Sequence, residues 1–374
     1  MLKVAQQRAT RAAFFIPGFV TACWAPLVPF AKARASLEEA ALGVVLLGLG
    51  VGSLLAMPAA GLFAARFGCR RVMLVAVAAM LGVLPCLALA SNLVSLGVAL
   101  LVFGASVGTF DCVMNVQAVV VERESGRSMM SGFHAFYSLG ALAGAIVASL
   151  LLAAGATPLF CTVAMGVAAI VLAGVFSRAW RAERVRSGTP VLALPRGVVI
   201  LIGIVCLVTF MAEGSVRDWS AVYLREVRGV ALARAGWGFV AFNLAMTITR
   251  LLGDRVVDRL GPALSVRIGG LMAAAGFATA ALTPSLSFTL AGYVLVGVGC
   301  ANVVPVMFTL AGRQTRLPAA VAVPAVSTMG YAGVLSGPAV IGFIAQSWTL
   351  TGAFLLTALA LAAAAILGSS LKIR

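Results

Sequence analysis

Two ionisable side chains in the first half of the chain, those of Asp111 and His134, lie within otherwise apolar sequence. Asp111 and Asn115 are four residues apart, a spacing that puts both side chains on one face of a helix. His134, the only histidine, follows at the start of the next apolar run. A carboxylate that faces an imidazole can exchange protons near neutral pH. The expected chemistry is a proton relay of Asp111 and His134, and a structural hydrogen bond is the alternative for each.

Further polar candidates lie in the second half. Glu213 stands four residues before Arg217, so we expect it about 6 Å from the outer end of its helix. There it would bind substrate or protons, or else pair with Arg217 at the interface. Arg250 is expected to pair with Asp254 or to anchor the topology. Neutral hydrogen-bonding residues that suit a polar substrate are Asn243, Asn302 and Tyr331.

The elements that must position these groups are membrane-spanning helices. Of 374 residues, 62% are hydrophobic and 10% charged, whereas soluble domains carry about 25% charged residues. A bilayer core about 30 Å thick needs about 20 apolar residues per helix. Apolar runs bounded by glycine, proline or charge fall at 11–31, 40–63, 72–91, 94–120, 130–153, 158–178, 198–218, 235–253, 263–283, 286–311, 319–343 and 349–369. The expected fold is an all-α membrane protein of twelve spans.

Six runs precede a polar stretch and six follow it. This predicts an N-terminal six-helix bundle, a cytoplasmic linker and a C-terminal six-helix bundle, over residues 1–180, 181–197 and 198–374. The tripeptide that begins at Arg66 recurs in related form at Arg259, a shift of 193 residues that also maps Gly140 onto Gly333. A duplicated six-helix unit, as found in transporters, is therefore expected.

The basic residues predict the orientation. The net charge is +16, and 21 of the 27 lysines and arginines fall on the side of the two termini. Loops that stay in the cytoplasm carry this excess, so both termini and the linker are expected there. The charge thus reflects topology, and no nucleic acid is expected as a partner. The seven scattered cysteines contain no CxxC pair, which predicts core residues and neither a metal nor a cofactor.

The loops after the second and eighth runs carry related motifs. Gly61-Leu-Phe-Ala-Ala-Arg66-Phe-Gly68-Cys-Arg70-Arg71 resembles the GxxxDRxGRR motif of the major facilitator superfamily, and Asp254-Arg255-Val-Val-Asp258-Arg259-Leu-Gly261 resembles its second copy. In that family such loops are thought to latch the cytoplasmic side through an acid, arginines and helix ends. Ala65 replaces the acid of the first copy, so a weaker or differently built latch is expected there. Positive-inside anchoring explains Arg70 and Arg71 equally well.

A second resemblance is more specific. The stretch from Asp111 to Gln117, the stretch from Ser131 to Gly140, and Asp218-Trp-Ser-Ala-Val-Tyr-Leu224 are similar to a bacterial subgroup of that superfamily related to fucose-type sugar permeases. The resemblance implies the superfamily fold and a transporter of the bacterial inner membrane. It supports a sugar as substrate only weakly.

Other functional classes find little support. No HExxH, GxSxG or P-loop motif occurs in the context that its chemistry requires, so neither an enzyme nor an ATP-driven pump is expected. We expect a monomeric secondary transporter that moves a small polar organic solute by alternating access, coupled to protons. Its expected partners are the lipid bilayer, the solute and protons. A drug or metabolite efflux antiporter, a channel and a membrane receptor remain the alternatives.

Overall fold

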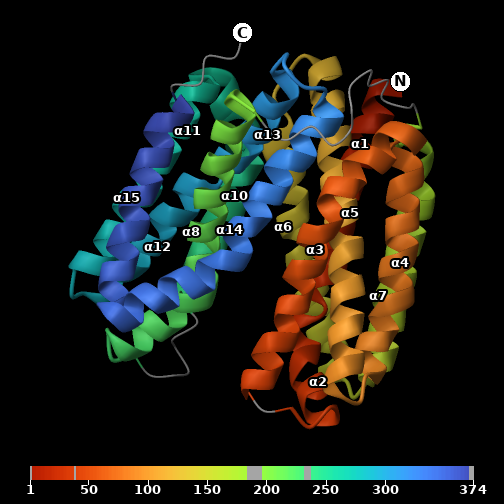
Figure 1. The fold of residues 1–374 in the computed structure, drawn as a ribbon, viewed down its shortest axis with the longest axis horizontal. Helices are drawn as coiled ribbons and strands as arrows, with labels where there is room; N and C mark the ends of the chain where they lie inside the picture. Colours follow the sequence, from red (N-terminus) through yellow and green to blue (C-terminus); the bar gives the residue numbers. More distant parts are fainter. Residues whose placement is uncertain (1, 38, 183–195, 231–236, 370–374) are drawn as a thin grey trace. The chain divides into compact units, whose positions relative to one another are not determined.

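In the computed structural model, the described residues are 2–37, 39–182, 196–230 and 237–369, and every regular element within them is helical (Figure 1). Ten helices are long and apolar enough to cross a membrane, when α12 (Leu286–Cys300) and α13 (Val303–Arg313) count as one span. Two further helices, α1 (Leu2–Ala22) and α10 (Trp237–Leu260), carry more charge and complete the twelve expected spans. The predicted all-α, twelve-span fold is confirmed.

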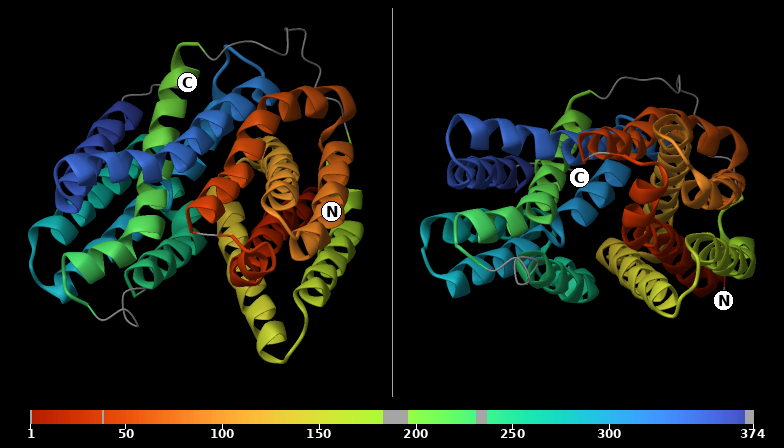
Figure 2. Two further views of the ribbon diagram at one scale, coloured as in Figure 1. Left: turned by 60° about the horizontal axis from the view of Figure 1, so that its bottom comes forward. Right: turned by 90° about the horizontal axis from the view of Figure 1, so that it is seen from below.

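The chain forms two compact units. The first takes in the described residues up to Gly126, those from Phe133 to 182, and Arg316–Ala325. Its further helices are η1 (Ala25–Leu27), α2 (Val28–Arg34), α3 (Glu39–Phe67), α4 (Cys69–Leu89), α5 (Leu93–Ser125), α6 (Met130–Ala153), α7 (Pro158–Phe176) and η2 (Ser177–Ala179). Within this unit α5 packs against α3, α4 and α1 (Figure 2). The chain therefore places Asp111 and Asn115 on the central helix of the unit.

The second unit contains Arg127–Gly132 and the remaining described residues. Its further helices are α8 (Val198–Glu226), α11 (Pro262–Leu282), α14 (Ala319–Ser347) and α15 (Leu350–Ser369). An aromatic cluster forms much of its core, because Phe354 packs against Tyr223, Phe277 and Tyr293. Residues 183–195, most of the predicted linker, lie outside the described residues, so the predicted domain boundaries stay predictions.

Two expected spans are interrupted, and proline explains both breaks. The first span was expected to run from 11 to 31, but α1 ends at Ala22 and a 3-10 turn leads into α2. Pro26 lies in that turn and lacks the N–H that would continue an α-helix. The tenth span was expected to be continuous over 286–311, but it divides between α12 and α13, four residues before Pro305.

The predicted repeat is visible in the backbone. α4 and α11 are both 21 residues long, and a shift of 193 aligns both of their ends. Gly68 and Gly261, which precede them, have φ angles of 83° and 78°, a region that favours glycine. An arginine caps the last turn of each helix: Arg34 donates to the Ala88 carbonyl, and Arg228 donates to the Ala281 carbonyl. The two halves thus share the glycine turn before this helix and the arginine that caps its end.

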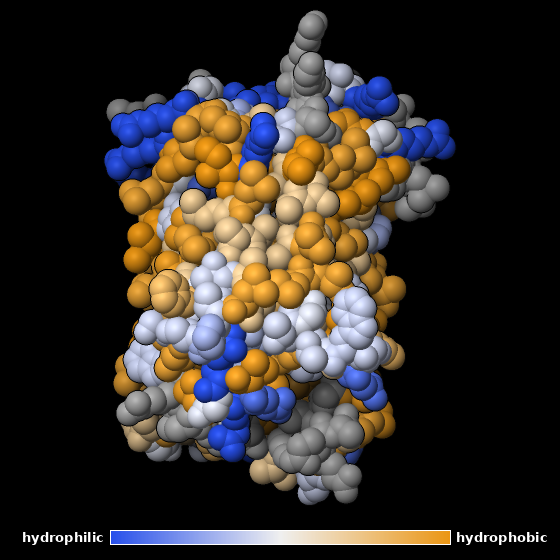
Figure 3. All heavy atoms as spheres, turned by 90° about the vertical axis from the view of Figure 1, so that its left-hand side faces the viewer, coloured by the Kyte–Doolittle hydropathy of each residue, from blue (hydrophilic) through white to orange (hydrophobic). Residues whose placement is uncertain are grey.

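The surface has the character expected of a chain in lipid. On the side where α11 and α15 lie, hydrophobic residues cover much of the face, and hydrophilic residues gather towards its two ends (Figure 3). Large apolar side chains such as Leu359 and Ile366 of α15 are 66% and 60% exposed. Exposed apolar residues in this number are unfavourable in water but not in a bilayer.

Candidate functional site

The second unit holds an ion pair in the middle of its spanning helices. Glu213 of α8 and Arg250 of α10 lie 3.5 Å apart between Oε1 and Nη2, and their side chains are only 16% and 9% exposed. Glu213 lies about 20 Å from either end of α8. Its predicted position near the outer end is wrong, because α8 continues to Glu226. Arg217, its other expected partner, forms an ion pair with Asp218 at 3.0 Å.

The break between α12 and α13 supplies a second partner for Arg250. The Arg250 Nε donates to the Ala301 carbonyl over 3.2 Å. In a continuous helix this carbonyl would accept the N–H of residue 305, but Pro305 has none. The proline therefore frees an acceptor for a buried cation. The sequence predicts Arg250 to be a topology anchor or a partner of Asp254, and no local pattern links it with Glu213 or Pro305.

The expected polar residues of the second unit fall into two groups. Asn302 lies at the helix break and is 8% exposed, not within a continuous helix as expected. Its Oδ1 lies so close to Gly253, one turn after Arg250, that a Cβ at Gly253 would clash with it. Asn302 therefore belongs to the surroundings of Arg250. Asn243, in contrast, is exposed on α10.

Tyr331 of α14 lies beside the same stretch of α8. Its ring meets the Phe210 ring edge-on, with the centroids 6.4 Å apart, and Phe210 precedes Glu213 by three residues, so the two point to similar sides of α8. The structure thus brings Glu213 and Asn302 to the neighbourhood of Arg250, while Tyr331 contacts Phe210 on the same stretch of α8. We call Glu213, Arg250, the Ala301 carbonyl and Asn302 the charged cluster of the second unit.

The first unit buries its expected polar residues along α5. Asp111 and Asn115 are 9% and 1% exposed, and the Asn115 Nδ2 donates to the Asp111 carbonyl at 2.9 Å. The two residues share a face, as their spacing predicts. His134 of α6 lies edge-on to Phe14 of α1, with the ring centroids 5.1 Å apart. The expected pairing of Asp111 with His134 stays a prediction.

The second copy of the loop motif caps a helix with carboxylates. Asp254 Oδ2 accepts the Gly132 N–H at 3.0 Å, and Asp258 Oδ1 accepts the Ser128 N–H at 3.2 Å. Gly132 lies in the first turn of α6 and Ser128 lies two residues before the helix, both in the segment that belongs to the second unit. A negative charge at a helix N-terminus is favourable because the first N–H groups have no partner within the helix. Arg259 of the same motif is exposed, and Gly261 forms the turn described above.

The first copy of the motif is built from close packing. Gly61 lies against the start of α14, where an added Cβ would come within 2.5 Å of the Ala320 carbonyl oxygen and of Pro324 Cγ. Arg66 and Arg71 are exposed, and the Arg66 guanidinium stacks over Phe67 at 5.3 Å. Arg70 contributes its backbone N–H, which donates to the Arg181 carbonyl at 2.8 Å. Ala65 predicts a weaker or differently built latch in the first copy. In the structure, the absence of a side chain at Gly61 lets α3 pack closely against the start of α14.

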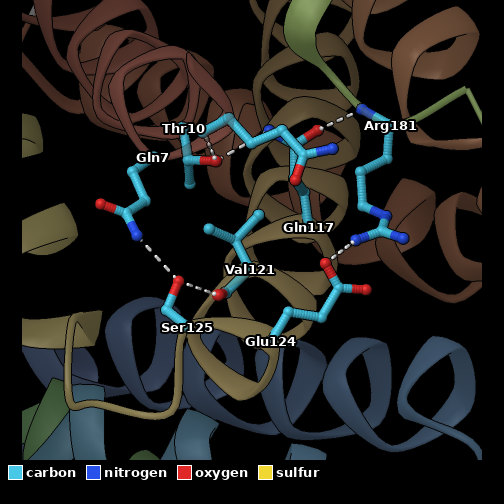
Figure 4. A network of polar contacts seen from close by, with 8 residues as sticks. Gln7, Thr10, Gln117, Val121, Glu124, Ser125 and Arg181 are labelled. Carbon is cyan, nitrogen blue, oxygen red and sulfur yellow. Dashed lines mark hydrogen bonds and ion pairs between the residues drawn. The ribbon is translucent and has the colours of Figure 1, made fainter. Parts of the chain in front are cut away.

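A polar network at the end of α5 was not anticipated from the sequence (Figure 4). Gln117 Nε2 donates to Thr10 Oγ1 at 3.0 Å, and Gln117 Oε1 accepts the Arg181 N–H at 3.2 Å. The Arg181 side chain pairs with Glu124 at 2.5 Å. The network ties α1, α5 and the segment after η2 together at one end of the first unit. Its partners lie far apart in sequence, so no local motif indicates it.

The described residues show little that suggests metal binding. No group of three or more histidine, cysteine, aspartate or glutamate side chains within them could hold a metal ion. All seven cysteines are free, and all except Cys86 are buried. The six buried ones pack as small apolar residues, as the sequence predicts, whereas Cys86 lies at the surface.

Comparison with known proteins agrees with this architecture. The family profile of the Major Facilitator Superfamily matches residues 10–322 and 202–373. An uncharacterised MFS-type transporter of Yersinia pestis is 47% identical over 352 residues, which cover 94% of this chain and 92% of the relative. The structure of the fucose:proton symporter of Escherichia coli is similar, with a TM-score of 0.82 at 15% identity over 98% of each chain. The human organic anion transporter MFSD10 gives a TM-score of 0.80 at 13% identity over 98% of this chain and 99% of that one.

Proposed function

Because the chain belongs to the major facilitator superfamily and is thus a multi-pass membrane transporter, we propose that it carries a small polar organic solute by alternating access and couples this movement to protons. Both termini are proposed to lie in the cytoplasm of a bacterium, with the spans in the inner membrane and the monomer as the working form. The buried Glu213–Arg250 pair is the observation that supports the proposal most strongly.

An ion pair within spanning helices needs a functional reason. Charges inside a bilayer are costly, and they persist where they bind ions or substrates. Removing one partner of a buried pair leaves the other charge uncompensated, at a cost of about 3–5 kcal/mol. Protonation of Glu213 would have the same consequence for Arg250. Proton binding to Glu213 therefore leaves the Arg250 cation without its ion-pair partner, so that Arg250 needs a new one.

A polar solute can supply that partner. The Arg250 guanidinium presents several N–H donors, of which Nε is held by the Ala301 carbonyl. The donors that Glu213 gives up on protonation can bind a carboxylate or a hydroxyl of the solute. Proton and solute then favour each other's binding, which is thermodynamic coupling between two ligands. In this scheme Glu213 is the proton acceptor and Arg250 the substrate-binding group.

The buried groups of the first unit fit the same function. Asp111 and His134 are proposed to form a proton relay, with Asn115 as a hydrogen-bonding neighbour of Asp111. Asn243, Asn302 and Tyr331 are proposed substrate contacts. Of the two proteins with similar structures, one is a fucose:proton symporter and the other an organic anion transporter. Both hydroxylated and acidic solutes therefore belong in a first screen.

The proposal is tested in two stages. Thermal unfolding of purified protein is first measured with sugars, carboxylates, amino acids and cationic drugs. Solutes that stabilise the protein are then tested for uptake into proteoliposomes under an imposed pH gradient. The expected result is saturable accumulation that collapses when a protonophore removes the gradient. A channel would show no saturation or counterflow, a receptor would show binding without flux, and an efflux antiporter would exchange protons in the opposite direction.

A matched pair of variants assigns the coupling. Glu213→Gln should remove gradient-driven accumulation, since the amide cannot exchange protons with the medium. Asp218→Asn alters an acid five residues further along α8, which pairs with Arg217, and should leave accumulation intact. Asp111→Asn is expected to impair accumulation as well, if the relay operates. Undiminished accumulation in Glu213→Gln would remove Glu213 from the proposed mechanism.

A further inference from the structure

A long apolar groove runs along the surface of the first unit between α3 and α4, with α5 as its floor. Its volume is about 750 Å³. α5 packs closely against both neighbours, whereas α3 and α4 contact each other little (Figure 1). The groove therefore results from two helices that stand apart on a third.

The walls of the groove are exposed and apolar. Leu55 of α3 and Val75 of α4 are both 69% exposed, and Phe63 and Val102 are 48% and 42% exposed. The lining extends along α3 from Phe67 back to Gly52, about 22 Å at the rise of a helix. One leaflet of the bilayer core is about 15 Å thick. A lipid acyl chain can thus lie along the groove through a full leaflet.

One end of the groove is positively charged. Arg71 lines it there and is exposed, and Arg66 at the end of α3 and Arg70 at the start of α4 flank the turn between these helices. No acidic residue occurs from Gly61 to Arg71. The N-terminus of α4, which begins at Cys69 and has no acid in its first turn, adds a partial positive charge.

The neighbouring acid does not neutralise this end. Glu124 is held by Arg181 at 2.5 Å, and the Arg181 carbonyl in turn accepts the Arg70 N–H. This end of the helices is also the side where the basic residues predict the cytoplasm. Anionic lipids gather on that leaflet next to basic residues at the ends of spans.

We propose that the groove is a binding site for an anionic phospholipid. One acyl chain lies against Leu55, Phe63 and Val75, and the headgroup phosphate binds Arg71. The replacement of the family's acid by Ala65 makes the site possible, since a carboxylate in this turn would repel the phosphate. The site belongs to the first unit alone and does not depend on the proposed transport mechanism.

Photo-crosslinking tests the site directly. Full-length protein in nanodiscs of phosphatidylcholine receives a trace of phosphatidylglycerol with a diazirine in its acyl chain, and labelled peptides are identified by mass spectrometry. A phosphatidylcholine probe with the same chain serves as the comparison. The expected result is labelling of α3 and α4 peptides that line the groove, several-fold stronger with the phosphatidylglycerol probe. Unlabelled phosphatidylglycerol should compete, and glycerol phosphate should not.

Three variants separate charge from shape. Arg71→Ala should lower the phosphatidylglycerol labelling several-fold and bring it close to that of phosphatidylcholine. Ala79→Trp places a large side chain at an exposed position in the groove and should lower labelling by both probes. Arg267→Ala removes an exposed arginine of α11 outside the groove and should change neither. Unchanged thermal unfolding in detergent verifies that each variant is folded.

Several outcomes would overturn the proposal. Equal labelling by the two probes would mean a groove that merely contacts bulk lipid. An Arg71→Ala variant with undiminished phosphatidylglycerol labelling would remove the charged end from the site. Competition by glycerol phosphate without an acyl chain would identify a phosphate site and not a lipid site.

Discussion

The two halves of the repeat share a scaffold but differ in where they carry charge. Under the shift of 193 residues, the acidic and basic residues Glu213, Arg250, Asp254 and Asp258 correspond to Val20, Met57, Gly61 and Ala65. In the other direction, Asp111 and His134 correspond to Val304 and Ser327. The glycine turns and arginine caps are common to both halves. Duplication thus preserved what builds the helices, while the chemistry is divided unequally between the halves.

The central helix of each half shows the same contrast. α5 continues unbroken through Cys112, whereas its counterpart breaks ahead of Pro305, the equivalent position. The unbroken helix buries Asp111, whose backbone carbonyl accepts a hydrogen bond from the Asn115 side chain. The broken helix turns the Ala301 carbonyl towards Arg250. A buried cation needs acceptors, and here a proline provides one without an additional charged side chain.

The largest effect is expected when Arg250 takes the character of its counterpart, Met57. Arg250→Met leaves Glu213 with a buried, unpaired charge, so the protein should lose about 3–5 kcal/mol of stability. Thermal unfolding in detergent measures this loss, and uptake should vanish. The double variant Glu213→Val with Arg250→Met copies the first half and should recover much of the stability but no transport. A single variant as stable as the wild type would mean that the pair is not energetically significant.

The next effect concerns the packed contact at Gly61. Gly61→Ala introduces a Cβ within 2.5 Å of the Ala320 oxygen and Pro324. Overpacking of this kind costs about 1–3 kcal/mol, and the unfolding temperature should fall accordingly. Gly97, also in the first unit, has open space around it, so Gly97→Ala is a matched control. Equal effects of the two substitutions would contradict the close packing described for the first motif.

A smaller effect is expected at the carboxylate cap. Asp254→Ala removes the acceptor of the Gly132 N–H, and loss of a helix cap costs about 1 kcal/mol. Asp254→Asn retains an acceptor oxygen and should lose less. Asp258→Ala, at an exposed hydrogen bond, should lose less again. Comparison of the three unfolding temperatures checks this order. A larger loss of stability in Asp258→Ala than in Asp254→Ala would contradict the claim that Asp254 is the stronger cap.

Pro305→Ala should change stability least. Alanine restores an N–H four residues after the Ala301 carbonyl, so a helical hydrogen bond there can replace the one from Arg250. Because one hydrogen bond to this carbonyl replaces another, we expect little net change in stability, together with weaker substrate binding in the thermal-shift assay. Wild-type affinity in this variant would show that the freed carbonyl does not position Arg250.

Hydropathy and charge were sufficient to predict the helices, their number and the repeat, because each span must satisfy its own backbone within lipid. The apolar run ends at Arg217 and Asp218, so hydropathy does not predict that α8 continues to Glu226. Pro305 lies in a run that is otherwise apolar, so hydropathy does not predict the break at Asn302. The Glu213–Arg250 pair and the Gln117 network join helices that are distant in sequence. Neither has a local pattern, so each required the folded chain to be seen.

The central claim is that Glu213 couples proton movement to solute movement. The most direct measurement follows the external pH of lightly buffered proteoliposomes when a transported solute is added without a pH gradient. The wild type should draw protons in with the solute, whereas Glu213→Gln should show no pH change and retain solute counterflow. Proton uptake by Glu213→Gln equal to that of the wild type would contradict the account.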